Sequence, residues 1–450
     1  MSESSFFKQN VDKIVADDEF RGKMNARYDF FKKVVMNSAS HYSDFELEKS
    51  RAFNIRNRAF RNYDKLLVDF ETNCLSNGVT VKWARDAEEA KQMVYDIIVG
   101  EKAKNIIKTK NTVAEEIGLL SFLKMKKMNV SETNSGDFIC YCDDERPSDS
   151  QHPAAHLTLH EISERFTDKF SVKPNLKPNQ LMTIVRKVLK NSYINADIAI
   201  TGANFFVSDT GGIVISEDEG NVMKSIASAG KHVVLTGIDR LVATLDDMST
   251  LLPLSSIYEV SRNRVSANYI FANKPDFLIL VDNGRSVVIE KEYQRQIMTC
   301  LDCGGCHSIC PIFNTIGGHV YEMSLPGPVG TVIKPIIEGA ESASHFATLC
   351  TSCHQCDDYC PMNIKISDLI LRNRMDVVKE NRSLIDEKNM FLFMKKRVEN
   401  RKNMDKQNMF INMEYRQLMK KKWGIRRVIP SFAEKTFSQL WKEANGITEK

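Results

Sequence analysis

The chain has 450 residues, of which 42% are hydrophobic and 27% charged, and its net charge is only +4. This composition is typical of a soluble globular protein with two or three domains, and the balance of charge argues against a nucleic-acid binder. No apolar run approaches the ~20 residues that span a bilayer. The first 20 residues carry acids where a signal peptide would be apolar, so we expect a cytoplasmic protein.

Residues 1–70 are charged and patterned for helix, and we predict an N-terminal helical region there. Four arginines recur in its second half: Arg51, Arg56, Arg58 and Arg61. The simplest interpretation places them on a solvated helix face.

Residues 71–290 alternate between strand and helix patterns, which predicts an α/β domain with a mainly parallel sheet. Thr158-x-x-Glu161 is a capping box that begins one helix. The other predicted elements are helix 66–77, strand 79–83, helix 86–99, strand 105–108, helix 112–128, helix 181–193, strand 197–200, strand 233–235 and helix 239–252.

Four details of this region are further predictions. Gly211-Gly212 and 282–284 (Asp-Asn-Gly) each predict a hairpin, and the second would close the domain. Cys140 and Cys142 alternate along 137–142, which favours a strand. Cys74 lies in a helix pattern and is predicted to be buried.

Three loops of the α/β domain follow predicted strands: 108–112, 201–204 and 236–239. In open α/β sheets, ligands bind beyond the carboxyl ends of the strands, and helix N-termini favour anions such as a carboxylate, a phosphate or a coenzyme tail. Alternatively, these loops are simple turns and their lysines are solvated. No dinucleotide or P-loop fingerprint is present in the expected context. The candidate ligand-binding residues are Lys108, Lys110, Thr201, Gly202 and Asn204.

Three histidines, His152, His156 and His160, recur every four residues. On one continuous helix they could bind zinc. Pro153 and the cap at Thr158 instead favour a loop that enters a helix.

Cysteine spacing is the strongest signal, because eight of the eleven cysteines lie between positions 300 and 360. They form two runs of C-x2-C-x2-C-x3-C-P, the spacing of bacterial iron–sulfur proteins. Zinc sites usually combine two C-x-x-C pairs and do not use this rhythm. The runs are Cys300, Cys303, Cys306 and Cys310 before Pro311, and Cys350, Cys353, Cys356 and Cys360 before Pro361.

Two [4Fe–4S] clusters are therefore the predicted cofactors. In two-cluster ferredoxins the fourth cysteine of each run ligates the other cluster. The predicted ligands are Cys300, Cys303, Cys306 and Cys360 for cluster 1, and Cys350, Cys353, Cys356 and Cys310 for cluster 2.

The 39-residue insert between the runs is long for a small β-rich ferredoxin, and segments 292–298, 338–349 and 366–382 look helical. We predict a helical ferredoxin module over residues 291–375. Its histidines are interpreted as surroundings of the clusters rather than catalysts; they are His307, His319, His345 and His354.

Residues 376–450 are predicted to form a basic, Met-rich helical tail. The stretch 372–427 alone contains 17 Lys or Arg and 7 Asp or Glu. Its basic face either packs on the protein itself and is solvated, or docks on an acidic partner subunit or the anionic inner face of a membrane.

Beyond the cysteines, the chain resembles the lactate utilization protein B family from about residue 60 to 375. Asp149 and Leu325 depart from the pattern of that family, which often has histidine and tyrosine there. The resemblance rests on Lys108–Leu119, Asp197–Asn204, Glu217–Asn221, Asp282–Arg285 and Gly317–Gly330.

The resemblance implies that residues 71–290 form a lactate-utilization domain similar to the sugar-isomerase and CoA-transferase fold. It implies an iron–sulfur electron-transfer subunit of a complex that oxidises L-lactate to pyruvate. It also implies two partners, a cysteine-rich subunit resembling heterodisulfide reductase and a smaller lactate-utilization-domain protein. Three alternatives remain open: a role with another 2-hydroxy acid such as glycolate, a redox or ligand sensor, and a zinc-bearing scaffold. No residue stands out as a catalytic base.

Overall fold

The computed structural model describes residues 3–259, 267–271, 275–321, 325–339, 345–379 and parts of 391–403 and 435–446. The chain divides into two compact units, residues 1–380 and 381–450. The first unit contains the α/β domain and the cysteine runs, and the second contains the tail.

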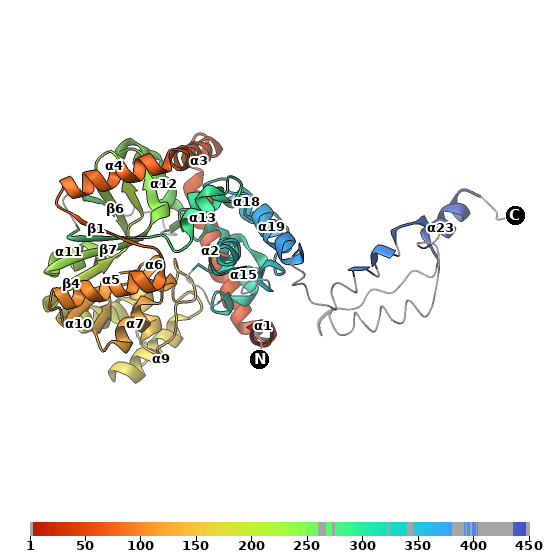
Figure 1. Ribbon diagram of the computed structural model, residues 1–450. Helices are drawn as coiled ribbons and strands as arrows, with labels where there is room; N and C mark the ends of the chain where they lie inside the picture. Colours follow the sequence, from red (N-terminus) through yellow and green to blue (C-terminus); the bar gives the residue numbers. More distant parts are fainter. Residues whose placement is uncertain are drawn as a thin grey trace. The chain divides into compact units, whose positions relative to one another are not determined.

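A six-stranded parallel sheet forms the centre of the first unit, in the order β1-β10-β7-β4-β2-β3 (Figure 1). The central strands are short and apolar, as expected of strands that helices cover on both faces. The strands predicted over 79–83, 105–108, 197–200 and 233–235 are all present in this sheet. Its members are β1 (Thr80–Ala84), β2 (Asn105–Lys108), β3 (Asn129–Glu132), β4 (Ile198–Thr201), β7 (Lys231–Gly237) and β10 (Phe277–Val281).

Helices cover both faces of this sheet. One face packs against α5 (Ala87–Gly100), α6 (Thr112–Glu116) and α7 (Leu119–Met125). Part of the other face, over β2 and β4, packs against α9 (Leu159–Phe170) and α10 (Pro178–Ile194). Two predicted caps are confirmed, since the Asp86 side chain accepts from Glu89 N and Thr158 with Glu161 forms a complete capping box. A cap predicted at Thr112 is wrong, because the N-cap of α6 is Asn111, whose side chain accepts from Ala114 N.

A second, four-stranded sheet lies in the order β8-β5-β6-β9. Its β5 (Phe205–Val207) and β6 (Gly212–Glu217) form the hairpin predicted at Gly211, with β8 (Leu241–Val242) and β9 (Ala267–Phe271) outside them. Gly211 has φ +64°, and a Cβ there would lie 2.7 Å from the backbone nitrogen of the buried Cys74. Glycine is therefore required where this hairpin meets α4 (Tyr63–Ser76).

Two predicted elements are wrong near the end of the α/β domain. The segment 239–252 is not one helix, because η1 (Ile238–Arg240), β8, η2 (Leu245–Asp247) and α12 (Met248–Glu259) follow one another there. The Asp282–Gly284 turn does not form a hairpin, because β10 pairs in parallel with both neighbours and the chain leaves it into α13 (Arg285–Glu290). Asp282 instead accepts hydrogen bonds from the backbone and hydroxyl of Ser286, at 2.7 and 2.6 Å.

Two further segments differ from prediction for local reasons. Cys140 lies in α8 (Ser135–Tyr141) and not in a strand, because the Asn134 side chain accepts from the N–H groups of Gly136 and Asp137 and begins a helix. The helix predicted over 112–128 is divided into α6 and α7 at Gly118, whose φ is +68°.

The N-terminal helices pack against the cysteine-rich module at the other end of the sequence of the first unit. Helix α2 (Asp18–Ala39) lies beside α15 (Pro311–Ile316) in the cysteine-rich module, together with α1 (Glu3–Ala16) (Figure 1). Their shared core places Tyr28 against Phe313, with ring centroids 5.5 Å apart. Helices α1 and α2 therefore cover a module that follows them by more than two hundred positions.

Arg56 on α3 (Phe45–Arg61) contradicts the prediction of a solvated arginine face, since its side chain is fully buried. Its guanidinium donates to the carbonyl oxygens of Asp239, Leu241 and Met298, the last two at 2.6 and 2.9 Å. Burial and, to a smaller extent, the charge of Arg240 lower the pKa of Arg56 to about 10. The side chain thus joins α3 to β8 and to the segment before the first cysteine run.

Replacing Arg56 with methionine should destabilise the protein by about 3–5 kcal/mol, because three buried carbonyls lose their donor. Arg51→Met is the matched control, since Arg51 lies on the same helix, is 57% exposed and pairs with Glu48. We expect the control to change stability by less than about 0.5 kcal/mol. Urea unfolding of the anaerobic protein measures both, and equal effects would contradict the burial of Arg56.

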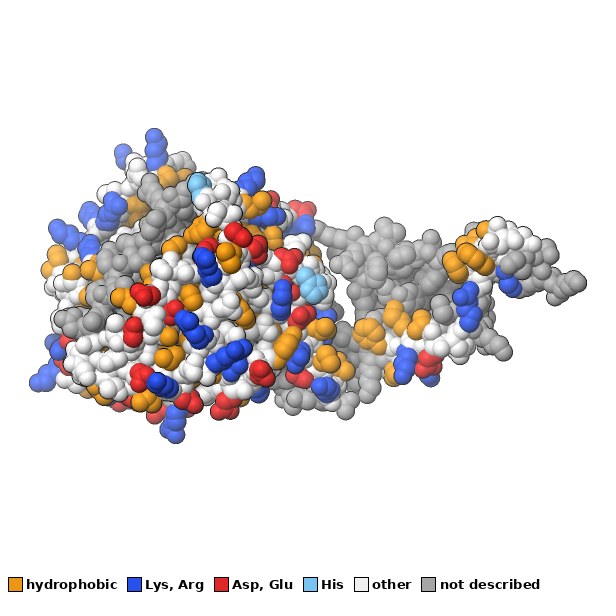
Figure 2. All heavy atoms as spheres, turned by 90° about the horizontal axis from the view of Figure 1, so that it is seen from above, with side chains coloured by type: hydrophobic (Ala, Val, Ile, Leu, Met, Phe, Trp, Pro, Cys, Tyr) orange, Lys and Arg blue, Asp and Glu red, His pale blue; other side chains and the backbone are white. Residues whose placement is uncertain are grey.

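The surface of the first unit carries mixed charge. On the face in Figure 2, the described basic and acidic side chains are interspersed rather than gathered by sign. Among the described helices, none is long and apolar enough to cross a membrane. Most of the predicted basic tail lies outside the described residues, apart from 391–403 in part and the helix α23 (Phe437–Ala444).

Candidate metal centre and its adjoining pocket

The two cysteine runs adopt the same backbone. Each passes through two left-handed residues, Asp302 and Gly304 in the first and Ser352 and His354 in the second, with φ between 54° and 69°. A five-residue helix follows, α14 (Gly305–Ile309) or α18 (Gln355–Tyr359), and each fourth cysteine is extended. In each loop a backbone N–H two residues after the first cysteine points at its sulfur, at 3.4 Å. The repeated spacing therefore encodes a repeated fold.

The fourth cysteine of each run lies beside the other run. Burial, with smaller contributions from the neighbouring Cys350 and Cys353, raises the pKa of the Cys310 thiol to about 11. Burial likewise raises the pKa of Cys300, with Asp302, Cys303 and Cys360 contributing. This is the arrangement that exchanged ligation between the runs requires.

The cysteines of the predicted second set surround one hollow of about 460 Å³. Its walls are largely apolar, and soft thiols in an apolar setting suit iron–sulfur chemistry better than a hard cation. The residues thus fit such a group. The thiols that line the hollow are Cys310, Cys350, Cys353 and Cys356.

The two predicted ligand sets differ in the exposure of their cysteines. Cys303 and Cys360 are buried, whereas Cys353 is exposed. Basic side chains donate hydrogen bonds to backbone carbonyls of the second run. Arg374 donates to Cys350 O at 2.8 Å, and the nearly buried Lys49 donates to Asp358 O at 2.8 Å. The first set therefore contains no exposed cysteine, whereas the second contains the exposed Cys353.

The module around the runs is helical, as predicted. Segment 292–298 is the 3-10 helix η3 (Gln294–Thr299), and α19 (Ile366–Lys379) matches the prediction for 366–382 up to residue 379. Part of 338–349 lies outside the described residues, and α16 (Gly327–Glu338) precedes it.

A polar pocket of about 830 Å³ opens at the carboxyl ends of β2, β4 and β7. Three of the predicted ligand-binding residues line it, namely Lys110, Gly202 and Asn204. Its opposite wall includes Leu301 and Asp302 of the first cysteine loop. A molecule in this pocket would therefore lie directly against the first run.

Lys108 does not line this pocket. It is fully buried, and its ammonium pairs with Glu132 at 2.6 Å and Glu115 at 3.0 Å. Burial alone would lower the pKa of Lys108, but the two carboxylates raise it well above its usual value. The prediction that its charge serves a ligand is wrong in this structure, because the charge is used internally.

Thr201 also points away from the pocket. Its hydroxyl lies 2.9 Å from the ring nitrogen Nε2 of His232, and its carbonyl accepts from the Asn111 side chain at 3.0 Å. Lys110 does reach the pocket, donating to the neutral Gln151 at 2.7 Å. Among the described residues Lys110 forms no ion pair, so its positive charge is available to an anion.

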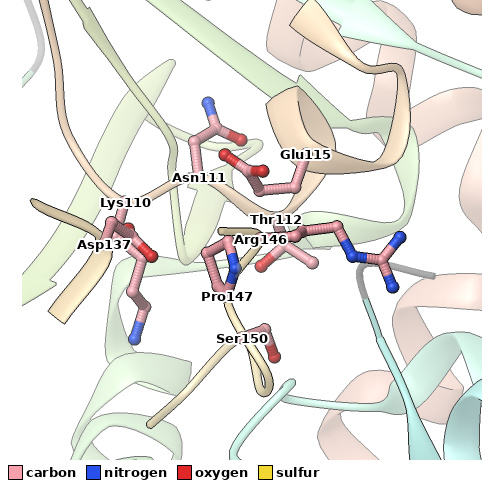
Figure 3. Close-up of a pocket in the computed structure, with 8 residues that line it drawn as sticks. All are labelled: Lys110, Asn111, Thr112, Glu115, Asp137, Arg146, Pro147 and Ser150. Carbon is pink, nitrogen blue, oxygen red and sulfur yellow. The ribbon is translucent and has the colours of Figure 1, made fainter. Parts of the chain in front are cut away.

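A second hollow, of about 430 Å³, is also lined by the loop from Lys110 to Thr112 (Figure 3). Glu115 and the buried Asp137 line it, and burial raises the pKa of Asp137 well above its usual value. Figure 3 shows the Arg146 guanidinium pointing away from Lys110. The loop from Lys110 to Thr112 thus contributes to the lining of both hollows.

Sequence reasoning missed the ion pairs that connect the pocket to the cysteines. Arg240 pairs with Asp302 beside the first run and lies 3.4 Å from Asp239. Arg285 binds Asp239 at 2.6 Å and Glu116 at 2.7 Å. The residues lie in the 236–239 loop, which was predicted as a ligand-binding loop or a simple turn, and in the Asp-Asn-Gly-Arg segment, which was predicted as a hairpin turn.

The histidines near the runs support the structure around them. His307 Nδ1 lies 3.0 Å from Asp149, which also accepts from the hydroxyl of Tyr28 at 3.1 Å. Burial alone would raise the pKa of Asp149, but His307 holds it below its usual range. Asp149, the residue that departs from the family pattern, therefore anchors α2 and the first run together.

Comparison with known proteins divides the chain in the same way. A LUD domain model matches residues 67–277, and a 4Fe-4S dicluster domain model matches residues 296–364. A protein named Lactate utilization protein B from Oceanobacillus iheyensis is 30% identical over 397 residues, covering 85% of this chain and 82% of its own length. This chain belongs to the lactate utilization protein B family.

Other relatives agree with this membership. Lactate utilization protein B from Bacillus subtilis is 29% identical and covers 85% of this chain and 82% of its own. An Escherichia coli protein named "Uncharacterized electron transport protein YkgF" is 29% identical over 76% of this chain and 74% of its own. This member of the family is thus an iron–sulfur protein with an α/β LUD domain and a ferredoxin-type module.

Proposed function

We propose that this chain is the iron–sulfur electron-transfer subunit of a cytoplasmic complex that oxidises L-lactate to pyruvate. The observation that carries the proposal is the polar pocket at the strand ends, walled by the loop of the first cysteine run. The family membership supports lactate as the donor. Oxidation of lactate to pyruvate releases two electrons and two protons.

We propose two [4Fe–4S] clusters, each held by three cysteines of one run and the fourth of the other. When bound, each cluster can take up and release one electron. The backbone N–H groups of Asp302 and Ser352 point at sulfur and would stabilise the added negative charge. Arg240 and Arg374 add positive charge beside the two runs.

The different exposure of the cysteines suggests a direction for electron transfer through the chain. The donor side would be the pocket, where Lys110 offers an unpaired cation to a carboxylate and the buried Cys303 lies behind Leu301 and Asp302. The acceptor side would be the surface at the exposed Cys353. A partner subunit that receives electrons would dock there.

The partners we propose are a cysteine-rich subunit resembling heterodisulfide reductase and a smaller lactate-utilization-domain protein. The basic tail would contact a subunit or the anionic inner face of the membrane. Co-purification of a tagged chain with and without residues 381–450 tests the contribution of the tail.

The test of the function is spectroscopic. The complex is isolated anaerobically, L-lactate is added, and the visible absorbance and the EPR signal of reduced clusters are followed. We expect L-lactate to bleach the absorbance and glycolate to leave it unchanged. Lys110→Met should slow reduction by lactate without affecting reduction by dithionite. If dithionite reduces the clusters and lactate does not, the donor is wrong; if glycolate acts equally, the substrate is broader.

A further inference from the structure

Three side chains converge outside the cysteine runs. Glu145 Oε1 lies 3.1 Å from His156 Nε2 and 3.8 Å from His319 Nε2. The two imidazole rings are nearly perpendicular, with centroids 4.6 Å apart. One nitrogen or oxygen of each residue falls within 4.8 Å of the others. This spacing allows all three to reach a single ion.

These residues come from distant parts of the chain. Glu145 follows α8, and His156 lies in the loop before α9, both in the α/β domain. His319 begins η4 (His319–Tyr321) in the cysteine-rich module. Close packing holds the two segments together, because a Cβ at Gly318 would overlap the carbonyl oxygen of Ser148. The three side chains therefore meet at the contact between the two parts.

The carboxylate and the imidazoles are set up as ligands. Arg165 donates to Glu145 Oε2 at 2.6 Å and leaves Oε1 facing the imidazoles. His156 is only 8% exposed, and its Nδ1 has no hydrogen-bond partner among the described residues. Outer partners of this kind orient a ligating carboxylate. A buried imidazole with so few partners is costly unless something binds it.

We propose that Glu145, His156 and His319 bind one divalent transition-metal ion of the zinc class. Two imidazoles and one carboxylate are a ligand set that Zn²⁺ accepts, with a fourth position left to water. The donors are nitrogen and oxygen rather than sulfur, so the site is distinct from the clusters. Glu145 and His319 are each about one-third exposed, which lets an ion enter from solvent.

The ion would fasten the α/β domain to the module. His319 Nε2 lies 2.8 Å from the carbonyl oxygen of Arg146, and ion binding at this nitrogen requires it to release the proton donated there. The site is not the zinc site that a run of three histidines would form. The His152 ring packs against Phe31, with centroids 3.9 Å apart and planes tilted by 34°, and the exposed His160 lies 3.3 Å from Glu164.

The experiment uses the full chain, isolated anaerobically with its iron–sulfur content intact. Co²⁺ is titrated while its visible bands are followed, and Zn²⁺ is then used to displace it. We expect one Co²⁺ per chain, and a loss of affinity of at least tenfold in His319→Gln and in Glu145→Gln. His160→Gln is the matched control and should bind as the unmodified protein does. Iron content that is equal in all variants shows that they fold.

A second measurement does not depend on colour. Zn²⁺ should raise the unfolding temperature of the unmodified protein and of His160→Gln, and should raise it less in the two ligand variants. The proposal is overturned if all four proteins bind Co²⁺ equally, or if none binds it. It is also overturned if strong thiolate-to-cobalt absorption shows that the ion occupies cysteines. None of these results bears on lactate oxidation.

Discussion

Replacing Cys300 and Cys360 together should remove one cluster, whereas replacing Cys350 and Cys360 together should remove both. The reason is the exchange of fourth ligands, which places Cys360 beside the first run and Cys310 beside the second. With alanine at these positions, iron should fall from about eight to about four atoms per chain in the first variant and to about none in the second. Iron analysis and EPR of the dithionite-reduced proteins measure the difference.

If each run held its own cluster, the two double variants would give the reverse pattern. The control is a chain with alanine at Cys74 and Cys140, two buried cysteines outside the runs whose sulfurs donate to carbonyl oxygens. It should keep its full iron content. Loss of iron in the control would show that any buried cysteine change disturbs the module, and the pattern would then carry no information about ligation.

Lys108→Met should destabilise the protein by about 3–5 kcal/mol, because it leaves buried carboxylates without their cation. Glu132 is almost fully buried and Glu115 largely so, and both bind the Lys108 ammonium. Lys110→Met is the control, since Lys110 is partly exposed and binds only the neutral Gln151. We expect it to change stability by less than about 0.5 kcal/mol. Urea unfolding at pH 7 distinguishes the two lysines.

The effect of Lys108→Met should also depend on pH. Lys108 now lowers the pKa of Glu115, against the effect of burial, and without it burial should raise that pKa above its unfolded value. A carboxyl with a raised folded pKa stabilises below its unfolded pKa and loses that contribution as pH rises. The stability gap between variant and unmodified protein should therefore widen from about pH 5 to pH 8. A gap that narrows would contradict a buried ion cluster.

Regular features of this fold could be predicted from the sequence because their signals are local. The strands, the Asp86 and Thr158 caps and the two cysteine runs each depend on a few neighbouring residues. The buried ion pair of Lys108 could not be predicted, since its partner Glu132 lies on the neighbouring strand β3. The prediction that Arg56 is solvated was wrong for the same reason, because the carbonyls that accept its hydrogen bonds lie about two hundred residues later.

The errors at Cys140 and at Asp282–Gly284 have a different origin. Alternation along 137–142 and the turn residues at 282–284 are local signals, and neither contains information about which strands pair. An Asp-Asn-Gly turn favours a hairpin only if the next segment can pair antiparallel, and β10 already has parallel partners on both sides. The Glu145–His156–His319 cluster was invisible for a simpler reason, since His319 lies in the other part of the chain.

The packing of α2 on the cysteine-rich module has a consequence for synthesis of the protein. Met24, Tyr28 and Phe31 emerge from the ribosome early, but their partners Phe313 and Phe346 are made near the end. For most of translation this apolar face has nothing to cover it, which invites aggregation or chaperone binding. The first helices would therefore complete their packing only after the cysteine-rich module has been synthesised.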